Sequence, residues 1–140
     1  MFFLDTNIFL EYLLDQKRAL EVEKLFRFTA KKGIPLLCSH FSLHGIEAIL
    51  SNQKKFLELE TFLLFVHKTS NLAVYETAIE EEINVAKLVS EKGLDFDDAL
   101  QYFVTKKTDC QAIISFDKHF DKTDLVRATP EEILKSADNL

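Results

Sequence analysis

The 140-residue chain is long enough for one domain with a substantial core, and an apolar fraction of 47% excludes a disordered protein. Its formal net charge of −6 excludes a protein that binds nucleic acid by bulk electrostatics alone, because such proteins are basic. No apolar run is long enough to span a membrane and residues 1–4 are too short for a signal peptide, so we expect a cytoplasmic domain over residues 1–140 with no membrane partner.

Apolar periodicity and turn residues predict strands that alternate with helices. In chain order we expect a strand at 2–5, helices at 8–14 and 19–32, a strand at 34–38, helices at 40–51 and 54–68, a strand at 72–75, helices at 77–92 and 95–107, strands at 112–115 and 125–128, and a helix that begins at 129–130. This alternation predicts an α/β fold in which helices cover both faces of a parallel sheet. Ligands of such sheets bind beyond the carboxyl ends of the strands, where the strand order reverses.

Acidic residues interrupt four apolar segments. Asp5 follows the first strand, Glu47 lies among the apolar residues of the helix at 40–51, three aspartates open the helix at 95–107, and Asp117 follows the strand at 112–115. Acids in core-forming segments are costly unless they are paired or bind a metal. Four such acids indicate one shared pocket, and hence a metal-dependent enzyme that acts on phosphate esters.

Each acid also has a structural interpretation. Asp5 is a good helix N-cap, and Asp117 is a suitable turn residue. Glu47 would also be accounted for by a buried ion pair with a lysine or arginine. His40 and His44 share a helical face with Glu47, so a zinc site at this position is a further alternative.

The three aspartates at the start of the helix at 95–107 are ambiguous. Asp95 and Asp98 resemble a capping box, and acids in a first turn interact favourably with the helix dipole. Asp97 lies at the edge of the apolar face and Asp98 farther round, so the helical period slightly favours Asp97 as the residue that faces the pocket.

Five features are spread in order along nearly the whole chain. They are LDTN at 4–7, Glu47, DAL at 98–100, ISFDKHF at 114–120 and VRATPEEIL at 126–134. In this order and at this length, they resemble the PIN-domain nucleases and, more closely, the small VapC-type toxins. The resemblance implies a PIN-like three-layer α/β/α fold with a central parallel sheet of four to five strands in the order 3-2-1-4-5. One departure is at residues 101–103 (QYF), where many relatives have small residues; we expect it to alter the wall of the site.

The resemblance also implies the site. The family carries its third acid immediately before Ala-Leu, which selects Asp98 over Asp97. Asn7 and Ser115 match family polar residues and would orient ligands or contact phosphate. The implied catalytic residues, which are also the metal ligands, are Asp5, Glu47, Asp98 and Asp117. Because all these ligands are oxygen atoms, Mg²⁺ or Mn²⁺ is favoured over zinc.

The implied activity is metal-dependent hydrolysis of RNA phosphodiester bonds by an endoribonuclease, the toxin of a type II toxin–antitoxin pair. The implied partners are RNA, a small antitoxin and a second copy of the chain in a homodimer. Phe116, Phe120 and Tyr102 are candidates for stacking on an RNA base, although packing in the core also explains them. The alternatives are a non-catalytic PIN-like binding module, another Mg²⁺-dependent phosphohydrolase, and a structural protein whose acids are caps and ion pairs.

Overall fold

The five strands expected from the sequence pair in a single parallel sheet. The computed structural model describes residues 1–138. Its strands are β1 (Phe2–Leu4), β2 (Leu36–Ser39), β3 (Leu72–Tyr75), β4 (Ala112–Ile114) and β5 (Arg127–Ala128). They lie in the order β3-β2-β1-β4-β5 with every neighbouring pair parallel, which confirms the expected order 3-2-1-4-5.

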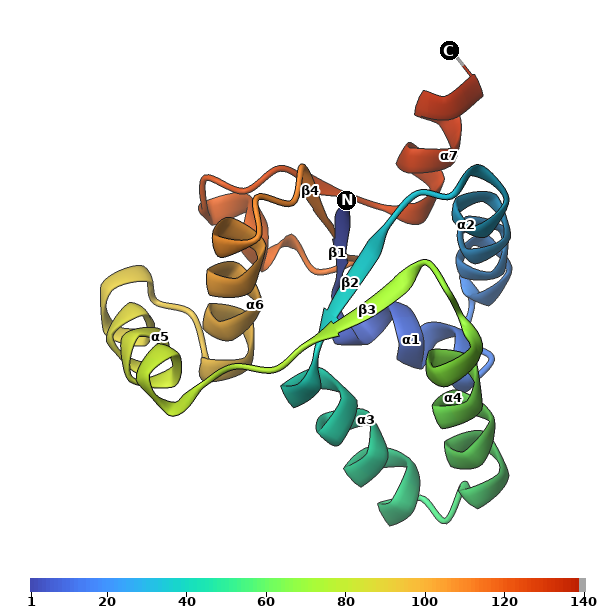
Figure 1. The fold of residues 1–140 in the computed structure, drawn as a ribbon, viewed down its shortest axis with the longest axis horizontal. Helices are drawn as coiled ribbons and strands as arrows, with labels where there is room; N and C mark the ends of the chain where they lie inside the picture. The colour runs from blue at the N-terminus through green and yellow to red at the C-terminus, as the bar shows by residue number, and fades with distance from the viewer. Residues whose placement is uncertain (139–140) are drawn as a thin grey trace.

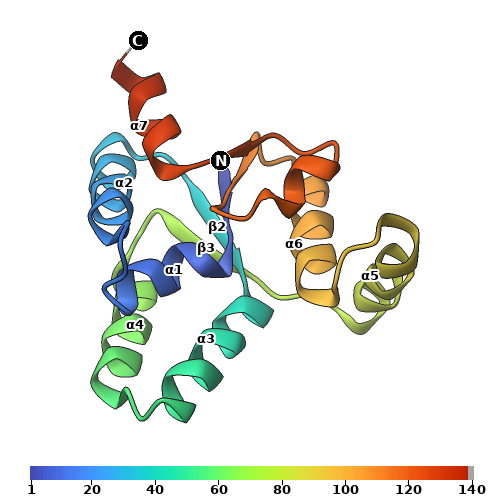
Figure 2. The same cartoon turned by 180° about the vertical axis from the view of Figure 1, so that it is seen from behind.

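Residues 1–138 also contain seven α-helices and one 3₁₀ helix, of which α7 follows the last strand and the others connect strands. The α-helices are α1 (Thr6–Leu13), α2 (Ala19–Lys32), α3 (His40–Asn52), α4 (Phe56–Lys68), α5 (Ile79–Lys92), α6 (Phe96–Lys107) and α7 (Pro130–Asp138), and the 3₁₀ helix is η1 (Lys118–Lys122). Helices α5 and α6 lie on one side of the sheet, and α1, α2 and α4 lie on the other (Figures 1 and 2). The expected three-layer α/β/α architecture is therefore confirmed.

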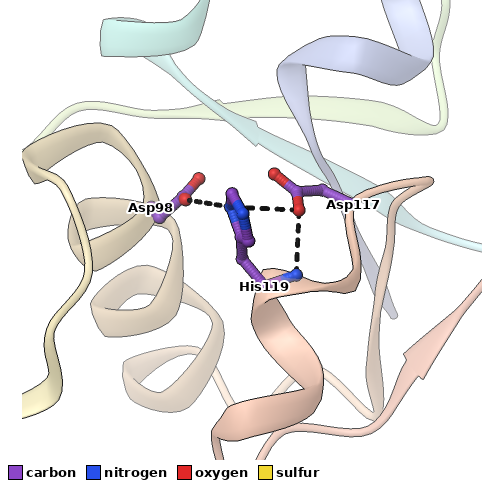
Figure 3. A group of neighbouring side chains, drawn as sticks. All are labelled: Asp98, Asp117 and His119. Atoms are coloured by element: carbon purple, nitrogen blue, oxygen red, sulfur yellow. Dashed lines mark hydrogen bonds and ion pairs between the residues drawn. The ribbon is translucent and has the colours of Figure 1, made fainter.

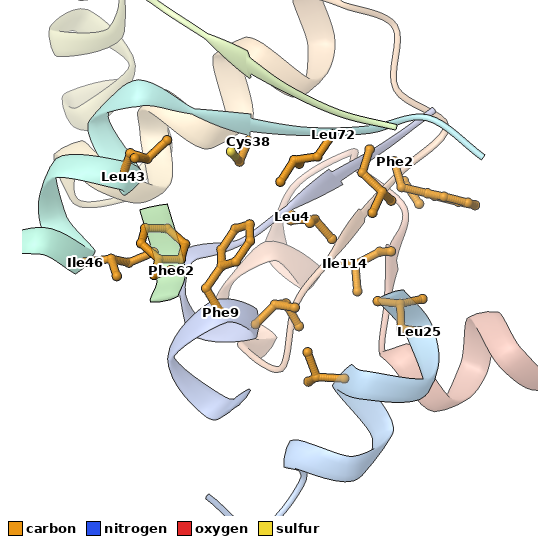
Figure 4. Packing of buried hydrophobic residues seen from close by; sticks show 14 of the residues in the cluster. Phe2, Leu4, Phe9, Leu25, Cys38, Leu43, Ile46, Phe62, Leu72 and Ile114 are labelled. Carbon is orange, nitrogen blue, oxygen red and sulfur yellow. The ribbon is translucent and has the colours of Figure 1, made fainter. Parts of the chain in front are cut away.

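Alternate strand residues face opposite layers, as the period of a strand requires. Phe2 and Leu4 join a large cluster with residues from α1 to α4, part of which Figure 4 shows. Phe3 points the other way, into a second cluster with residues of α5 and α6. Because β1 is buried on both faces, it reads as a continuous apolar run, which is typical of parallel sheets.

Several element boundaries differ from the prediction. Helix α4 begins at Phe56 rather than at 54, because Lys54 has a left-handed backbone (φ 56°) that cannot continue a helix. Strand β5 contains only two residues rather than four. Leu125 directs its N–H to the Thr123 hydroxyl at 3.2 Å, so its backbone turns before the ladder with β4 starts.

Strand order reverses between β1 and β4, because β1 leads on to β2 and β3 on one side while β4 and β5 lie on the other. The carboxyl ends of these two central strands are therefore adjacent, and this is where the fold predicts a ligand site. Within residues 1–138, no helix has both the length and the apolar character needed to cross a membrane.

Candidate metal centre

Asp5, the first residue after β1, presents a buried carboxyl group at the switch point. Asp5 occupies the N-cap position of α1, but its side chain makes no capping hydrogen bond. Instead Ser115, the first residue after β4, donates its hydroxyl to Asp5 Oδ2 at 2.5 Å. Burial raises the pKa of Asp5, and the hydrogen bond from Ser115 partly offsets that rise.

The hydroxyl of Ser115 connects three parts of the site. Besides donating to Asp5, it accepts the backbone N–H of Asp117 at 2.8 Å and the amide Nδ2 of Asn7 at 3.4 Å. One donor and two lone pairs are all that a hydroxyl offers, so each is used. Ser115 is fully buried. Its hydrogen bonds link the residues that follow β1 and β4.

Both Asp97 and Asp98 of α6 contribute charge to the site. Asp95 acts as the N-cap, since its Oδ1 accepts the N–H of Asp98 at 2.9 Å. Burial first and then repulsion from neighbouring carboxylates, Asp5 among them, raise the pKa of both Asp97 and Asp98 to about 6. Repulsion from Asp117 contributes for Asp98. The carboxylates of Asp5 and Asp117 are thus both close enough to Asp98 to raise its pKa.

Asp117 follows β4 by three residues and is joined by a histidine that the sequence argument did not place in the site. Asp117 Oδ1 accepts the backbone N–H of His119 at 2.8 Å, which starts η1. The His119 Nδ1 atom lies 3.1 Å from Asp117 Oδ1 and 3.6 Å from Asp98 Oδ2 (Figure 3). Its position two residues after Asp117, within the motif at 114–120, was the available signal in the sequence.

Glu47, the fourth predicted ligand, is not brought into contact with the other three. Its side chain is 33% exposed, at the edge of the apolar face of α3, and its Oε1 lies 3.0 Å from His44 Nδ1. Helix α3 does reach the site: the Thr6 hydroxyl next to Asp5 donates to Ser42 Oγ at 2.8 Å. Glu47 thus lies one to two helical turns along α3 from Ser42, the residue that contacts Thr6.

The alternative zinc site on α3 does not form. The rings of His40 and His44 stack with centroids 4.3 Å apart, and His40 Nδ1 lies 4.0 Å from Glu76 instead of approaching Glu47. Across the described residues, the group of metal-ligating side chains whose ligand atoms all lie within 4.8 Å of one another is Asp98, Asp117 and His119.

We call Asp5, Asp97, Asp98 and Asp117 the aspartate cluster. Two buried amide oxygens beside it, Asn7 Oδ1 and Gln101 Oε1, have no hydrogen-bond partner within residues 1–138. The Gln101 amide donates through Nε2 to Asp97 at 3.2 Å, so its oxygen lies next to the carboxylates.

Carboxylate and amide oxygens can coordinate Mg²⁺ or Mn²⁺ directly, or accept hydrogen bonds from the waters bound to these ions. A bound cation would also relieve the repulsion that raises the carboxyl pKa values. The donor set of the aspartate cluster therefore fits a divalent cation.

A match to a family profile identifies the family of this chain. The PIN domain family profile matches residues 2–126. This chain belongs to the PIN domain family. Comparison with curated protein sequences gave no significant match.

Solved structures share the fold of this PIN domain. VapC20 from Mycobacterium tuberculosis, a sarcin–ricin loop cleaving toxin, matches with a TM-score of 0.74 and 17% identity, over 90% of this chain and 97% of that one. VapBC2 from Rickettsia felis, bound to a DNA fragment from its promoter, matches with a TM-score of 0.70 and 17% identity, over 91% and 97%. A toxin–antitoxin complex from Klebsiella pneumoniae gives 0.66 and 16%, over 93% and 98%.

The three aromatic candidates for base stacking differ in accessibility in this PIN domain. Phe120 is completely buried, and Tyr102 is 7% exposed with its hydroxyl donated to Asp124 at 2.7 Å. Both therefore pack as core residues. Phe116 is half-buried, and the guanidinium of Arg18 lies 3.8 Å from its ring centroid. Of the three rings, Phe116 is thus the one that solvent reaches.

Proposed function

We propose that this PIN domain is a metal-dependent endoribonuclease that hydrolyses RNA phosphodiester bonds, and the toxin of a type II toxin–antitoxin pair. The observation that carries the proposal is the convergence of Asp5, Asp98 and Asp117 at the carboxyl ends of β1 and β4, where burial and mutual repulsion raise carboxyl pKa values. Membership of the PIN family and the shared fold with VapC toxins support it.

Asp5, Asp98 and Asp117 would hold Mg²⁺ or Mn²⁺ by their carboxylate oxygens, and Glu47 would join them from α3. When bound, the cation would lower the pKa of a water and stabilise negative charge on the scissile phosphate. Ser115 orients Asp5 through its 2.5 Å hydrogen bond. Because Ser115 is fully buried, it cannot reach a phosphodiester as a nucleophile, so we assign hydrolysis without a covalent intermediate.

The partners follow from the same proposal. The Klebsiella pneumoniae structure is a toxin–antitoxin complex, and we infer that a small antitoxin covers the site of this chain too. We further propose that residues 1–140 form one cytoplasmic domain that acts as a homodimer on single-stranded or looped RNA. The net charge of −6 means that RNA affinity must come from the bound cation and local basic groups such as Arg18, rather than from overall charge.

The test is cleavage of end-labelled RNA containing a hairpin loop, in Mn²⁺, in Mg²⁺ and in EDTA. We expect the parent to cut only with a divalent ion, and Asp5→Asn and Asp117→Asn to lose about 10³-fold in rate while their circular dichroism spectra stay unchanged. Asp109→Asn is the matched control. Asp109 is exposed in the turn between α6 and β4, at the amino-terminal ends of the strands and away from the site, and asparagine tolerates its positive φ of 55°.

Other results would overturn the proposal. A parent that binds this RNA without cutting it would be a binding module. A parent that hydrolyses p-nitrophenyl phosphate and leaves RNA intact would be a different phosphohydrolase. Cleavage by Asp5→Asn at the parent rate would remove the aspartate cluster from the mechanism.

A further inference from the structure

His119 places a nitrogen atom among the carboxylates of the site. The residue belongs to the first turn of η1, and its ring faces back toward α6, between Asp117 and Asp98 (Figure 3). Nδ1 lies 3.1 Å from Asp117 Oδ1 and 3.6 Å from Asp98 Oδ2. The His119 side chain is 62% exposed whereas that of Asp98 is 11% exposed, so the ring lies on the solvent side of the Asp98 carboxylate.

A hydrogen-bonded ion pair accounts for only one of these two contacts. Nδ1 carries at most one hydrogen, which it can direct at one carboxylate, so the second carboxylate receives none. Asp117 Oδ1 already accepts the backbone N–H of His119 at 2.8 Å. A divalent cation can bond to all three side chains at once.

The spacing of the three donor atoms suits such a cation. Adjacent ligands of an octahedral cation of this size lie about 3 Å apart. The nitrogen–oxygen distances of 3.1 and 3.6 Å are close to that value, and all three ligand atoms lie within 4.8 Å of one another. Because the imidazole is 62% exposed, a small rotation of its ring would complete the geometry.

Building on the proposed function, we propose that His119 Nδ1 is a ligand of the catalytic cation, and that this PIN domain therefore binds Mn²⁺ in preference to Mg²⁺. The physical reason is ligand type. Mg²⁺ is a hard ion that takes oxygen ligands and keeps its waters, and an imidazole nitrogen contributes little to its binding. Transition-metal ions accept imidazole, and Mn²⁺ also suits the carboxylates of Asp98 and Asp117.

The experiment measures metal binding directly, without RNA. Isothermal titration calorimetry would give the affinities of the parent, His119→Gln and His67→Gln for Mn²⁺ and for Mg²⁺. His67→Gln is the matched control, because His67 is an exposed histidine in the last turn of α4. We expect His119→Gln to lose at least about tenfold in Mn²⁺ affinity and less than about twofold in Mg²⁺ affinity.

Electron spin echo envelope modulation of the Mn²⁺ complex provides a second readout. Nitrogen modulation from a bound imidazole is expected in the parent and in His67→Gln, and it should disappear in His119→Gln. Because His119 is exposed, glutamine should leave the fold intact, and circular dichroism checks this.

Separate outcomes address the two proposals. A parent that cuts RNA but shows no nitrogen modulation, or a variant that loses affinity for both ions equally, overturns the histidine ligand and leaves the nuclease standing. A parent that shows the modulation but cuts no RNA overturns the nuclease and retains the ligand. A parent that binds neither ion overturns both.

Discussion

Replacing Asp98 with asparagine is expected to stabilise the metal-free protein while it removes a proposed metal ligand. Burial and repulsion from Asp95, Asp5, Asp117 and Asp97 raise the pKa of Asp98 from 3.8 to about 6. That difference corresponds to roughly 3 kcal/mol of unfavourable ionisation in the folded protein. Because the Asp98 side chain is 11% exposed, screening by solvent reduces the value to about 1 to 2 kcal/mol.

The stabilisation should depend on pH in a defined direction. Between pH 3.8 and about 6 the folded protein holds a proton on Asp98 that the unfolded chain has released, so stability falls as the pH rises through this window. Above pH 7 the folded protein bears the full free-energy cost of ionising Asp98. The advantage of Asp98→Asn should therefore be largest at pH 8 and smaller at pH 5, where part of the parent population is already protonated.

Thermal unfolding followed by circular dichroism tests this. In EDTA at pH 8 we expect Asp98→Asn to melt about 4 to 8 °C above the parent. With Mn²⁺ at about 100 times its Kd, binding should stabilise the parent by about 2.7 kcal/mol and the variant by much less, so the order should invert. The control Asp109→Asn should stay within about 0.5 kcal/mol of the parent in every condition.

A variant that melts below the parent in EDTA at pH 8 would refute the reasoning, because the carboxylate would then be stabilising. An advantage of equal size at pH 5 and pH 8 would also refute it, since it would not arise from the ionisation of Asp98.

Three further predictions address other parts of the molecule. Glu47→Gln should slow RNA cleavage about 10²-fold, and parent-like cleavage would exclude Glu47 from the site. Arg127→Ala removes a 3.0 Å hydrogen bond to the Ser115 carbonyl and two hydrogen bonds to Asp121. Because Ser115 is bonded to Asp5, we expect calorimetry to show weaker Mn²⁺ binding. Denaturant titration should show a loss of about 1 kcal/mol in the free energy of unfolding for the bond to Ser115. Phe62→Ala should cost about 3 to 5 kcal/mol in denaturant titration, because this ring is 1% exposed in the core, while Mn²⁺ affinity below the melting temperature stays unchanged.

The sequence was most informative about the sheet and about the residues at its switch point. Strand β1 is buried on both faces, so its apolar run followed by an aspartate identified both the strand and the position of Asp5. The alternation of strands and helices predicted the α/β class, but the strand order came from family resemblance, since local pattern does not determine which strands pair.

Side-chain partners were harder to predict. The helical period placed Glu47 among buried leucine and isoleucine residues, whereas the structure has it at the edge of that face, held by His44. The local sequence pattern cannot show whether such a side chain turns toward the core or toward solvent, because a residue at the edge of the apolar face can do either. The helical period could not separate Asp97 from Asp98 for the same reason: both approach Asp5, and only Asp98 also faces His119.

The Ser115–Asp5 hydrogen bond joins residues that are 110 positions apart. Loop closure over such a separation is achieved only once most of the polypeptide has been made and has collapsed around the central strands. A ribosome-bound fragment that has not yet reached residue 117 lacks both Asp117 and His119. During synthesis, the aspartate cluster therefore stays incomplete until Asp117 has left the ribosome.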